Sequence, residues 1–373
     1  MRLVWLLGLI AVVLAGGVAT ASEARTSDRS ATGAWALLPP APTADVSWYA
    51  ASAWTEQELI FTSDPSKSAV AYKPATKSWR TLPAGPPPTG PAQGGNFSVW
   101  TGGEMLVSGN ANAAYDPATD QWRRLPPPTR FGGMPAVVAW TGSEMIQWGG
   151  GCCGEFSDSG SAYTPATNRW RALPASPLAG RRETASAWTG KELVIAGGYA
   201  EVVRASVVHE VFFADAAAYK PRTRSWRRLP SLPAPPRRGA SAVWDGRDVL
   251  VVGGAAHHAP SQGATFDTPL ADVFAYRPST NRWRRLAPLP EGRVGQAAVW
   301  TGKQLLVWGG QILRHGKLVP TRTGLSYDPV RNRWTSIGAS PIAGPQPKAV
   351  WTGTSMIAWG GSQSRAASYT PRR

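Results

Sequence analysis

A motif that recurs along the whole chain constrains the fold more than any other feature of the sequence. A tryptophan followed by a tight turn and a short apolar run occurs seven times, at spacings of 40 to 56 residues. Self-similarity at such a period indicates repeated supersecondary units that must stack on one another to bury their apolar faces. The seven anchors are Trp54, Trp100, Trp140, Trp188, Trp244, Trp300 and Trp351.

Two further patterns complete each repeat. Six anchors continue as Trp-Thr-Gly or Trp-Asp-Gly, which supplies the positive φ of a hairpin turn, and the apolar run after the turn mostly ends on paired glycines. A second motif, Tyr-x-Pro-x-Thr-x-x-Trp, then leads into basic residues and Leu-Pro. It spans residues 72–79, 115–122, 163–170, 219–226, 276–283 and, with Arg331 in place of the threonine, 327–334. The pattern predicts four short strands per repeat, here called a to d in chain order.

The seventh repeat is divided between the two ends of the chain. Its C-terminal part stops at Tyr369-Thr370-Pro371, before the expected tryptophan, whereas the segment from Gly33 to Pro39 carries that tryptophan and Leu-Pro alone. We therefore expect the N-terminal segment to supply strand d for the C-terminal strands a, b and c. Such pairing would leave no open sheet edge at the junction.

Together these motifs resemble kelch repeats over residues 33–373. The resemblance implies an all-β fold, a seven-bladed β-propeller of four-stranded kelch-type blades closed by the N-terminal strand d. The two early repeats depart from the pattern, since Thr62-Ser63 and Ser108-Gly109 stand where later repeats have paired glycines.

The first 32 residues differ from the repeats. Residues 1–21 combine Arg2, an apolar run and the small-residue ending Ala19-Thr20-Ala21, which is the pattern of a secretory signal peptide. An uncleaved anchor helix is the alternative, because the apolar stretch is nearly long enough to span a bilayer. Residues 22–32 are expected to form a flexible leader into the propeller. The expected protein is secreted or held at the cell surface, monomeric, and without a transmembrane segment beyond the signal.

The charge balance is strongly basic. Lys and Arg number 39 against 23 Asp and Glu, a formal net charge of +16. Such a field attracts anionic envelopes and nucleic acid without specificity, and no base-reading motif accompanies it, so no specific nucleic-acid partner is predicted. Arginines that follow the strand-d tryptophan, such as Arg171, are interpreted as charges that prevent edge-to-edge association of the exposed outer strand.

Functional residues are expected in the loops at one mouth of the ring. The loops between strands b and c are long at residues 199–216, 255–272 and 311–324, and the loops between strands d and a carry arginines six or seven residues before the anchor tryptophan, or slightly earlier. Guanidinium groups bind carboxylates and phosphates through paired hydrogen bonds. We therefore predict a mouth that binds an anionic protein, glycan or cell-wall polymer, with solvated loop residues as the alternative. The ligand-binding candidates are Arg130, Arg182, Arg238, Arg293, His257, His258 and His315.

Metal binding is a second possibility for the histidines. Carboxylates such as Glu210 and Asp267 are nearby in sequence, but the spacing matches no known ligand motif, and the adjacent His257 and His258 point to opposite sides of an extended backbone. Solvated histidines are therefore favoured, and neither a metal nor a cofactor is expected.

The neighbouring Cys152 and Cys153 are expected to form a vicinal disulfide in an oxidising compartment, with two free thiols as the alternative.

The kelch resemblance also bears on catalysis. Galactose oxidase-like members hold copper through tyrosines and histidines, with one tyrosine cross-linked to a cysteine. In this chain the tyrosines fall mainly at repeat positions and the two cysteines are adjacent, so no copper ligand and no catalytic residue can be assigned. The prediction is a binding protein rather than an enzyme. A carbohydrate-acting enzyme, sialic-acid-processing or galactose oxidase-like, is the alternative.

Overall fold

The computed structural model describes residues 33–43, 50–88, 96–109, 111–129, 135–152, 155–204, 207–258, 266–360 and 365–372. The expected signal peptide and leader, Arg130 and Cys153 lie outside these residues, as do the side chains of Cys152 and His258. Within the described part of the chain, no helix is long and apolar enough to cross a membrane.

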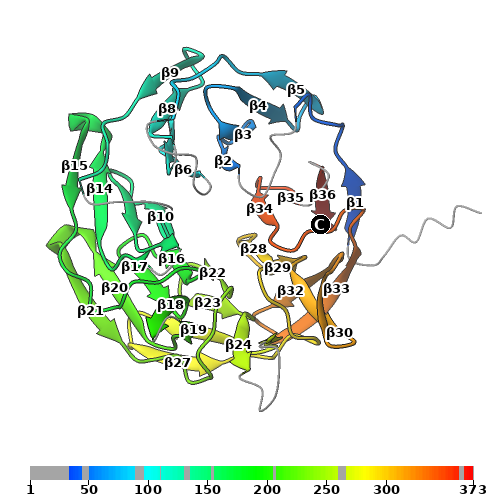
Figure 1. Ribbon diagram of the computed structural model, residues 1–373. Helices are drawn as coiled ribbons and strands as arrows, with labels where there is room; N and C mark the ends of the chain where they lie inside the picture. The colour runs from blue at the N-terminus through cyan, green and yellow to red at the C-terminus, as the bar shows by residue number, and fades with distance from the viewer. Residues whose placement is uncertain are drawn as a thin grey trace, which may run out of the picture.

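The described strands form seven four-stranded antiparallel sheets arranged in a ring (Figure 1). This confirms the predicted seven-bladed propeller. The first three blades are β2 (Ala51–Trp54), β3 (Leu59–Asp64), β4 (Ser68–Lys73) and β5 (Ser78–Thr81); β6 (Phe97–Trp100), β7 (Met105–Ser108), β8 (Ala113–Asp116) and β9 (Gln121–Arg124); and β10 (Val137–Trp140), β11 (Met145–Trp148), β14 (Gly160–Thr164) and β15 (Arg169–Ala172).

The other four blades follow in chain order. Blade 4 is β16 (Ala185–Trp188), β17 (Leu193–Ala196), β20 (Ala216–Lys220) and β21 (Ser225–Leu229); blade 5 is β22 (Ser241–Trp244), β23 (Val249–Val252), β26 (Val273–Arg277) and β27 (Arg282–Arg285); blade 6 is β28 (Ala297–Trp300), β29 (Leu305–Trp308), β32 (Thr323–Asp328) and β33 (Arg333–Ala339); blade 7 is β34 (Lys348–Trp351), β35 (Met356–Trp359), β36 (Ala366–Pro371) and β1 (Gly33–Leu37). Two short 3-10 turns, η1 (Pro165–Thr167) and η2 (Pro221–Thr223), join strands c and d.

The ring closes as the split repeat predicts. Strand β1 pairs antiparallel with β36, from Gly33 opposite Pro371 to Leu37 opposite Ala367. The two ends of the chain therefore share one sheet, and the strand order β1-β36-β35-β34 confirms that the N-terminal segment is strand d of blade 7.

The strand-d tryptophans explain why the repeat motif has its form. In each blade the tryptophan lies directly opposite the strand-c tyrosine, as Tyr219 does opposite Trp226 with ring centroids 5.1 Å apart. Its indole Nε1 also donates a hydrogen bond to a backbone carbonyl of the preceding blade, so each repeat is fastened to its neighbour. The seven bonds are Trp79 to Pro39, Trp122 to Pro83, Trp170 to Pro126, Trp226 to Pro174, Trp283 to Pro230, Trp334 to Ala287 and Trp35 to Ile337.

In four blades the first arginine after the tryptophan is bound within the structure, which differs from its interpretation as an edge charge. Arg171 donates to both carboxylate oxygens of Glu144 in its own blade, at 3.0 and 2.6 Å, and to the hydroxyl of Tyr219 in the next, at 3.2 Å. Arg80, Arg123 and Arg227 make the same set of contacts with their own blades and neighbours. These four arginines therefore join neighbouring blades, whereas Arg124 and Arg228 on the same strands are exposed.

The paired glycines allow close backbone contact near one mouth of the ring. Gly254 has φ +94°, its nitrogen donates to the carbonyl of Arg293 in the next blade, and an added Cβ would lie 2.8 Å from the carbonyl oxygen of Arg238. By contrast, Gly246 has φ +96° in a surface turn, where an added Cβ would meet no described atom within 4 Å.

This pair of glycines gives a matched test of the close approach. Both alanine substitutions place a side chain at positive φ, at a cost of about 1–2 kcal/mol. Gly254→Ala also forces atoms apart in a packed region, which adds about 1–3 kcal/mol. We expect Gly254→Ala to lower the free energy of unfolding in urea well below that of Gly246→Ala, whereas equal losses would show that the glycine pairs serve only backbone conformation.

Candidate functional site

Two β-hairpins stand over blades 4 and 5 and shape one side of the mouth. They lie in two of the segments expected as long loops between strands b and c, and consist of β18 (Tyr199–Arg204) with β19 (Val207–Phe212), and β24 (Ala255–His258) with β25 (Phe266–Pro269). Similar hairpins join strands b and c in two other blades, β12 (Gly151–Cys152) with β13 (Glu155–Phe156) and β30 (Gln311–Arg314) with β31 (Lys317–Pro320).

The segments that precede strand a of blades 4, 5 and 6 connect these hairpins to the ring. Backbone bridges join Arg182 to Tyr199, Arg238 to Ala255 and Val294 to Gln311. These bridges make Arg182, Arg238 and Val294 structurally equivalent, and they make the preceding residues, Arg181, Arg237 and Arg293, equivalent to one another.

Arg293 therefore does not belong with Arg182 and Arg238, although the sequence analysis grouped the three. Its side chain is 2% exposed and donates to the carbonyl oxygens of Gly309 and Thr323, at 3.3 and 3.2 Å. Burial lowers the pKa of its guanidinium to about 10. The grouping failed because the distance to the anchor tryptophan is one residue longer for Arg293, and its role is to support the blade from inside.

Arg182 and Arg238 come together in space, because both lie near the aromatic ring of Tyr199. Their guanidinium carbons lie 4.9 and 4.8 Å from the ring centroid of Tyr199. Arg182 donates to the Tyr199 hydroxyl at 2.6 Å and to Glu201 at 3.0 Å, while Arg238 donates to Asp267 at 2.6 Å. Both side chains remain about one-quarter exposed, 27% and 24%.

Glu183 completes this group and was missed by the sequence analysis. It has φ +53°, whereas the equivalent residues of the next two blades, Gly239 and Gly295, are glycines with φ +62° and +67°. Backbone hydrogen bonds run from Gly239 N to Glu183 O and from Gly295 N to Gly239 O, so these residues follow the rim around the axis. A non-glycine residue held in this conformation is strained, and such strain is concentrated at functional sites.

The electrostatics of Glu183 are unusual for a surface carboxylate. Burial raises its pKa above the ordinary value of 4.5, and the nearby carboxylates of Asp267 and Glu210 raise it further, against the opposing effect of Arg238 and Arg182. Its Oε2 lies 3.6 Å from Nη1 of Arg238, beyond hydrogen-bond range. Glu183 thus has a raised pKa although two cationic side chains lie nearby, as is common for groups that transfer protons.

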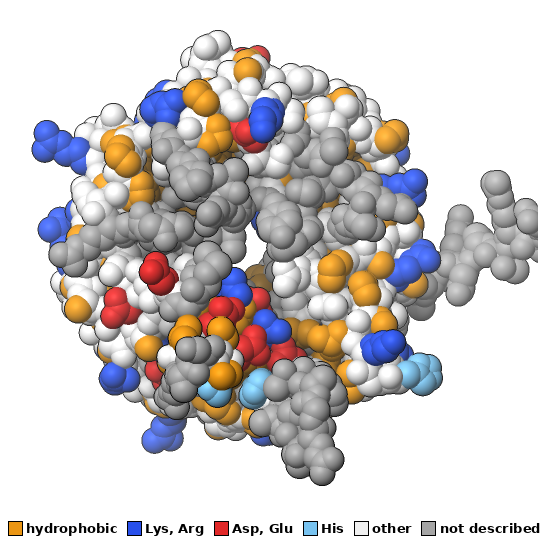
Figure 2. Space-filling view, viewed as in Figure 1, with side chains coloured by type: hydrophobic (Ala, Val, Ile, Leu, Met, Phe, Trp, Pro, Cys, Tyr) orange, Lys and Arg blue, Asp and Glu red, His pale blue; other side chains and the backbone are white. Residues whose placement is uncertain are grey.

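We call the side chains around this rim the mouth cluster: Arg182, Glu183, Tyr199, Glu201, Glu210, Arg238, His257 and Asp267. Figure 2 shows acidic and basic side chains gathered beside the central opening, over the region of β18, β19 and β24. Within it, donor atoms of Glu210, His257 and Asp267 lie within 4.8 Å of one another, so these three residues could hold a metal ion.

The other predicted residues lie elsewhere or cannot be placed. His315 is exposed in the turn between β30 and β31 and is not among the three residues that could hold a metal. The backbone of His258 pairs with Phe266, and that of Cys152 with Glu155, but their side chains lie outside the described residues, so the vicinal disulfide stays a prediction.

The comparisons with known proteins agree with the fold. A profile of the KLHDC2/KLHL20/DRC7 Kelch-repeats domain matches residues 92–310, more than half of the chain. The chain belongs to the kelch-repeat family. The solved structure of YjhT has the same fold, with a TM-score of 0.58 and 17% identity over 80% of this chain and 99% of that one.

Among curated proteins, this kelch propeller is similar to an N-acetylneuraminate epimerase of Yersinia enterocolitica, at 29% identity over 34% of this chain and 40% of the relative. It is also similar to human Kelch-like protein 34, at 31% identity over 26% of this chain and 16% of the relative. The aligned region thus spans less than half of either relative.

One signal in the sequence could have revealed Glu183. The rim segments of blades 4, 5 and 6 are Arg-Arg-Glu, Arg-Arg-Gly and Arg-Val-Gly, so a glutamate replaces glycine at one of three equivalent positions of this kelch propeller. The alignment of these segments depends on the buried arginine, which the structure identifies.

Proposed function

We propose that this protein binds a 2-keto sugar acid of the N-acetylneuraminate type at the mouth cluster and interconverts its two anomers. The observation that carries the proposal is Glu183, a strained, partly buried carboxyl group with a raised pKa and with its Oε2 3.6 Å from Nη1 of Arg238. The similarity to an N-acetylneuraminate epimerase supports this enzymatic alternative over binding alone.

The reaction needs only one proton-transfer group. In the closed sugar, C2 carries a hydroxyl group, the carboxylate and the ring oxygen. Glu183 takes the proton from the C2 hydroxyl and delivers it to the ring oxygen as the bond between C2 and that oxygen breaks. The open-chain keto acid rotates about the bond between C2 and C3, and the reverse steps close the ring on the other face of the ketone. No electrons are transferred, so no redox cofactor is required.

The arginines have a separate role in this proposal. Guanidinium groups bind carboxylates with charge-assisted hydrogen bonds. Arg182 uses Nε and Nη2 for Tyr199 and Glu201, and Arg238 uses Nε and Nη2 for Asp267, so their positions are fixed by protein contacts before a ligand arrives. Such preorganisation reduces the entropy lost on binding.

The direct test is proton NMR with N-acetylneuraminate released as a single anomer by a sialidase. We expect the protein to accelerate its conversion to the other anomer, and to have no effect on N-acetylglucosamine, which lacks the carboxylate. Tight binding of N-acetylneuraminate without acceleration would refute the catalytic part of the proposal and show a binding protein for anionic sugars. The absence of both binding and acceleration would refute the whole proposal.

The pH dependence of the same assay checks the role assigned to Glu183. The carboxylate form is needed to accept the proton, and its pKa is raised above 4.5 by burial. We therefore expect kcat/KM to fall on the acid side with a midpoint above pH 4.5. An acid limb at or below the ordinary value would contradict Glu183 as the proton-transfer group.

A further inference from the structure

A group of potential metal-ligand atoms lies within the mouth cluster. We propose that Glu210, His257 and Asp267 form a site for a first-row divalent transition ion, represented by Zn²⁺, which joins the hairpin of β18 and β19 to that of β24 and β25. The proposal does not depend on the sugar chemistry.

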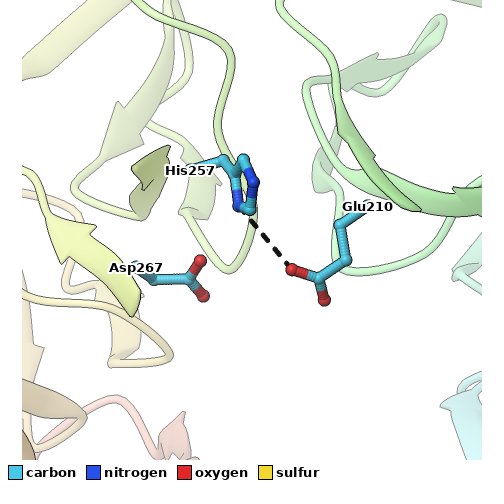
Figure 3. A group of neighbouring side chains, drawn as sticks. All are labelled: Glu210, His257 and Asp267. Atoms are coloured by element: carbon cyan, nitrogen blue, oxygen red, sulfur yellow. Dashed lines mark ion pairs between the residues drawn. The ribbon is translucent and has the colours of Figure 1, made fainter. Parts of the chain in front are cut away.

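The arrangement of the three side chains follows from strand register. His257 and Asp267 lie directly opposite each other on β24 and β25, so their side chains share one face of that hairpin. Glu210 approaches from β19, with its Oε2 3.8 Å from Nδ1 of His257. Figure 3 shows the imidazole ring and the two carboxylates turned toward a common space.

An unsatisfied nitrogen points to a missing partner in this space. Nδ1 of His257 is buried and has no hydrogen-bond partner within the described part of the chain. A buried polar atom without a partner is costly, and imidazole nitrogen is a preferred ligand of Zn²⁺. The ring itself is held by packing, since it lies 5.2 Å from the ring of Phe212.

The excess of carboxylates in the mouth cluster also favours the binding of a cation. The cluster holds four carboxylates against two guanidinium groups, in a protein whose formal net charge is +16. Moreover, Glu201 and Glu210 lie directly opposite each other on β18 and β19. Like charges at such positions are destabilising. Arg182 neutralises Glu201, whereas Glu210 has its Oε2 3.8 Å from Nδ1 of His257, beyond hydrogen-bond range.

The contacts around the group suit a metal site. Nε and Nη2 of Arg238 both contact Oδ2 of Asp267, so a guanidinium orients the carboxylate through one of its two oxygens. Carboxylates that bind metals are commonly fixed by such a second partner. Donor atoms around tetrahedral Zn²⁺ lie about 3.3 Å apart. Side-chain rotation of Glu210, which is 32% exposed, can bring its oxygen closer to the other two donors.

The experiment uses untagged full-length protein stripped with a chelator and titrated with Zn²⁺ by calorimetry, with Co²⁺ absorption as a report on coordination. We expect one ion per chain and a melting temperature that rises with Zn²⁺ concentration. His257→Ala and Glu210→Gln should each weaken binding at least about 10-fold. His209→Ala, which removes an exposed histidine adjacent to Glu210, and His315→Ala should bind as the wild type does.

Metal-free stability separates loss of the ligand from loss of the fold. Glu210→Gln removes the like-charge pair with Glu201, so without metal this variant should melt at or above the wild-type temperature while losing Zn²⁺ binding. Absence of saturable binding, binding retained in both His257→Ala and Glu210→Gln, or binding lost in His209→Ala would overturn the proposal.

Discussion

The Glu183→Gln variant is expected to convert N-acetylneuraminate anomers about 100-fold or more slowly than the wild type. Glutamine keeps the shape of the side chain but cannot accept and return a proton, and positioned acid-base groups contribute about 10²–10⁴-fold to rates. Because the arginines keep their partners Glu201 and Asp267, sugar binding should change far less than turnover. NMR line-shape or single-anomer kinetics measure the rate, and calorimetry measures the affinity.

A matched control is available at another strained glutamate. Glu56 also has positive φ, +71°, but it is exposed in the turn between β2 and β3. Glu56→Gln should therefore keep full activity. Activity retained by Glu183→Gln, or lost equally in both variants, would remove Glu183 from the mechanism.

The stability of the same variant should change in the opposite direction from its activity. A carboxyl group whose pKa is raised in the folded state destabilises that state at pH values above the folded pKa, and this cost disappears below the unfolded pKa. Glu183→Gln should thus melt at a higher temperature than the wild type at pH 7, with the difference vanishing as the pH falls below 4.5. A lower melting temperature at pH 7 would show that the charge of Glu183 is stabilising.

The fold was predictable because the same pattern of strands and turns is encoded in seven repeats of the sequence. The Tyr-x-Pro-x-Thr-x-x-Trp pattern specifies a cross-strand aromatic pair and a hydrogen bond to the preceding blade, as Tyr219 and Trp226 show. The split repeat likewise predicts ring closure, since an isolated strand d has one vacant position to fill.

The candidate site could be predicted only in part because its residues come from insertions that the repeat does not govern. Arg182, Arg238 and His257 were identified from composition and position, but counting back from the anchor tryptophan placed Arg293 with them, although it is buried. Glu183, Glu201 and Tyr199 become visible only when β18 pairs with β19 and the rim residues of neighbouring blades are aligned by their hydrogen bonds.

The largest stability loss is expected from disruption of the N-terminal strand that closes the ring. Trp35 lies 5.7 Å from Trp308 and 5.3 Å from Tyr369 between ring centroids, and its Nε1 donates to the carbonyl of Ile337 at 3.1 Å. Trp35→Ala should therefore lower the free energy of unfolding by about 3–5 kcal/mol. Leu37→Ala, on the same strand but with a side chain from a residue 49% exposed, should cost less than about 0.5 kcal/mol.

Deletion of residues 33–39 tests closure itself, because it removes strand β1 together with a contact to blade 1. It exposes the edge of β36 and also removes the carbonyl of Pro39, which accepts the indole hydrogen bond of Trp79 in blade 1. Both sides of the junction between blades 7 and 1 are then weakened at once. We expect a melting temperature lowered beyond that of Trp35→Ala, together with self-association through the open edge, measured by differential scanning calorimetry and light scattering. A monomer that melts as the wild type does would mean that the other blade contacts hold the ring without this strand.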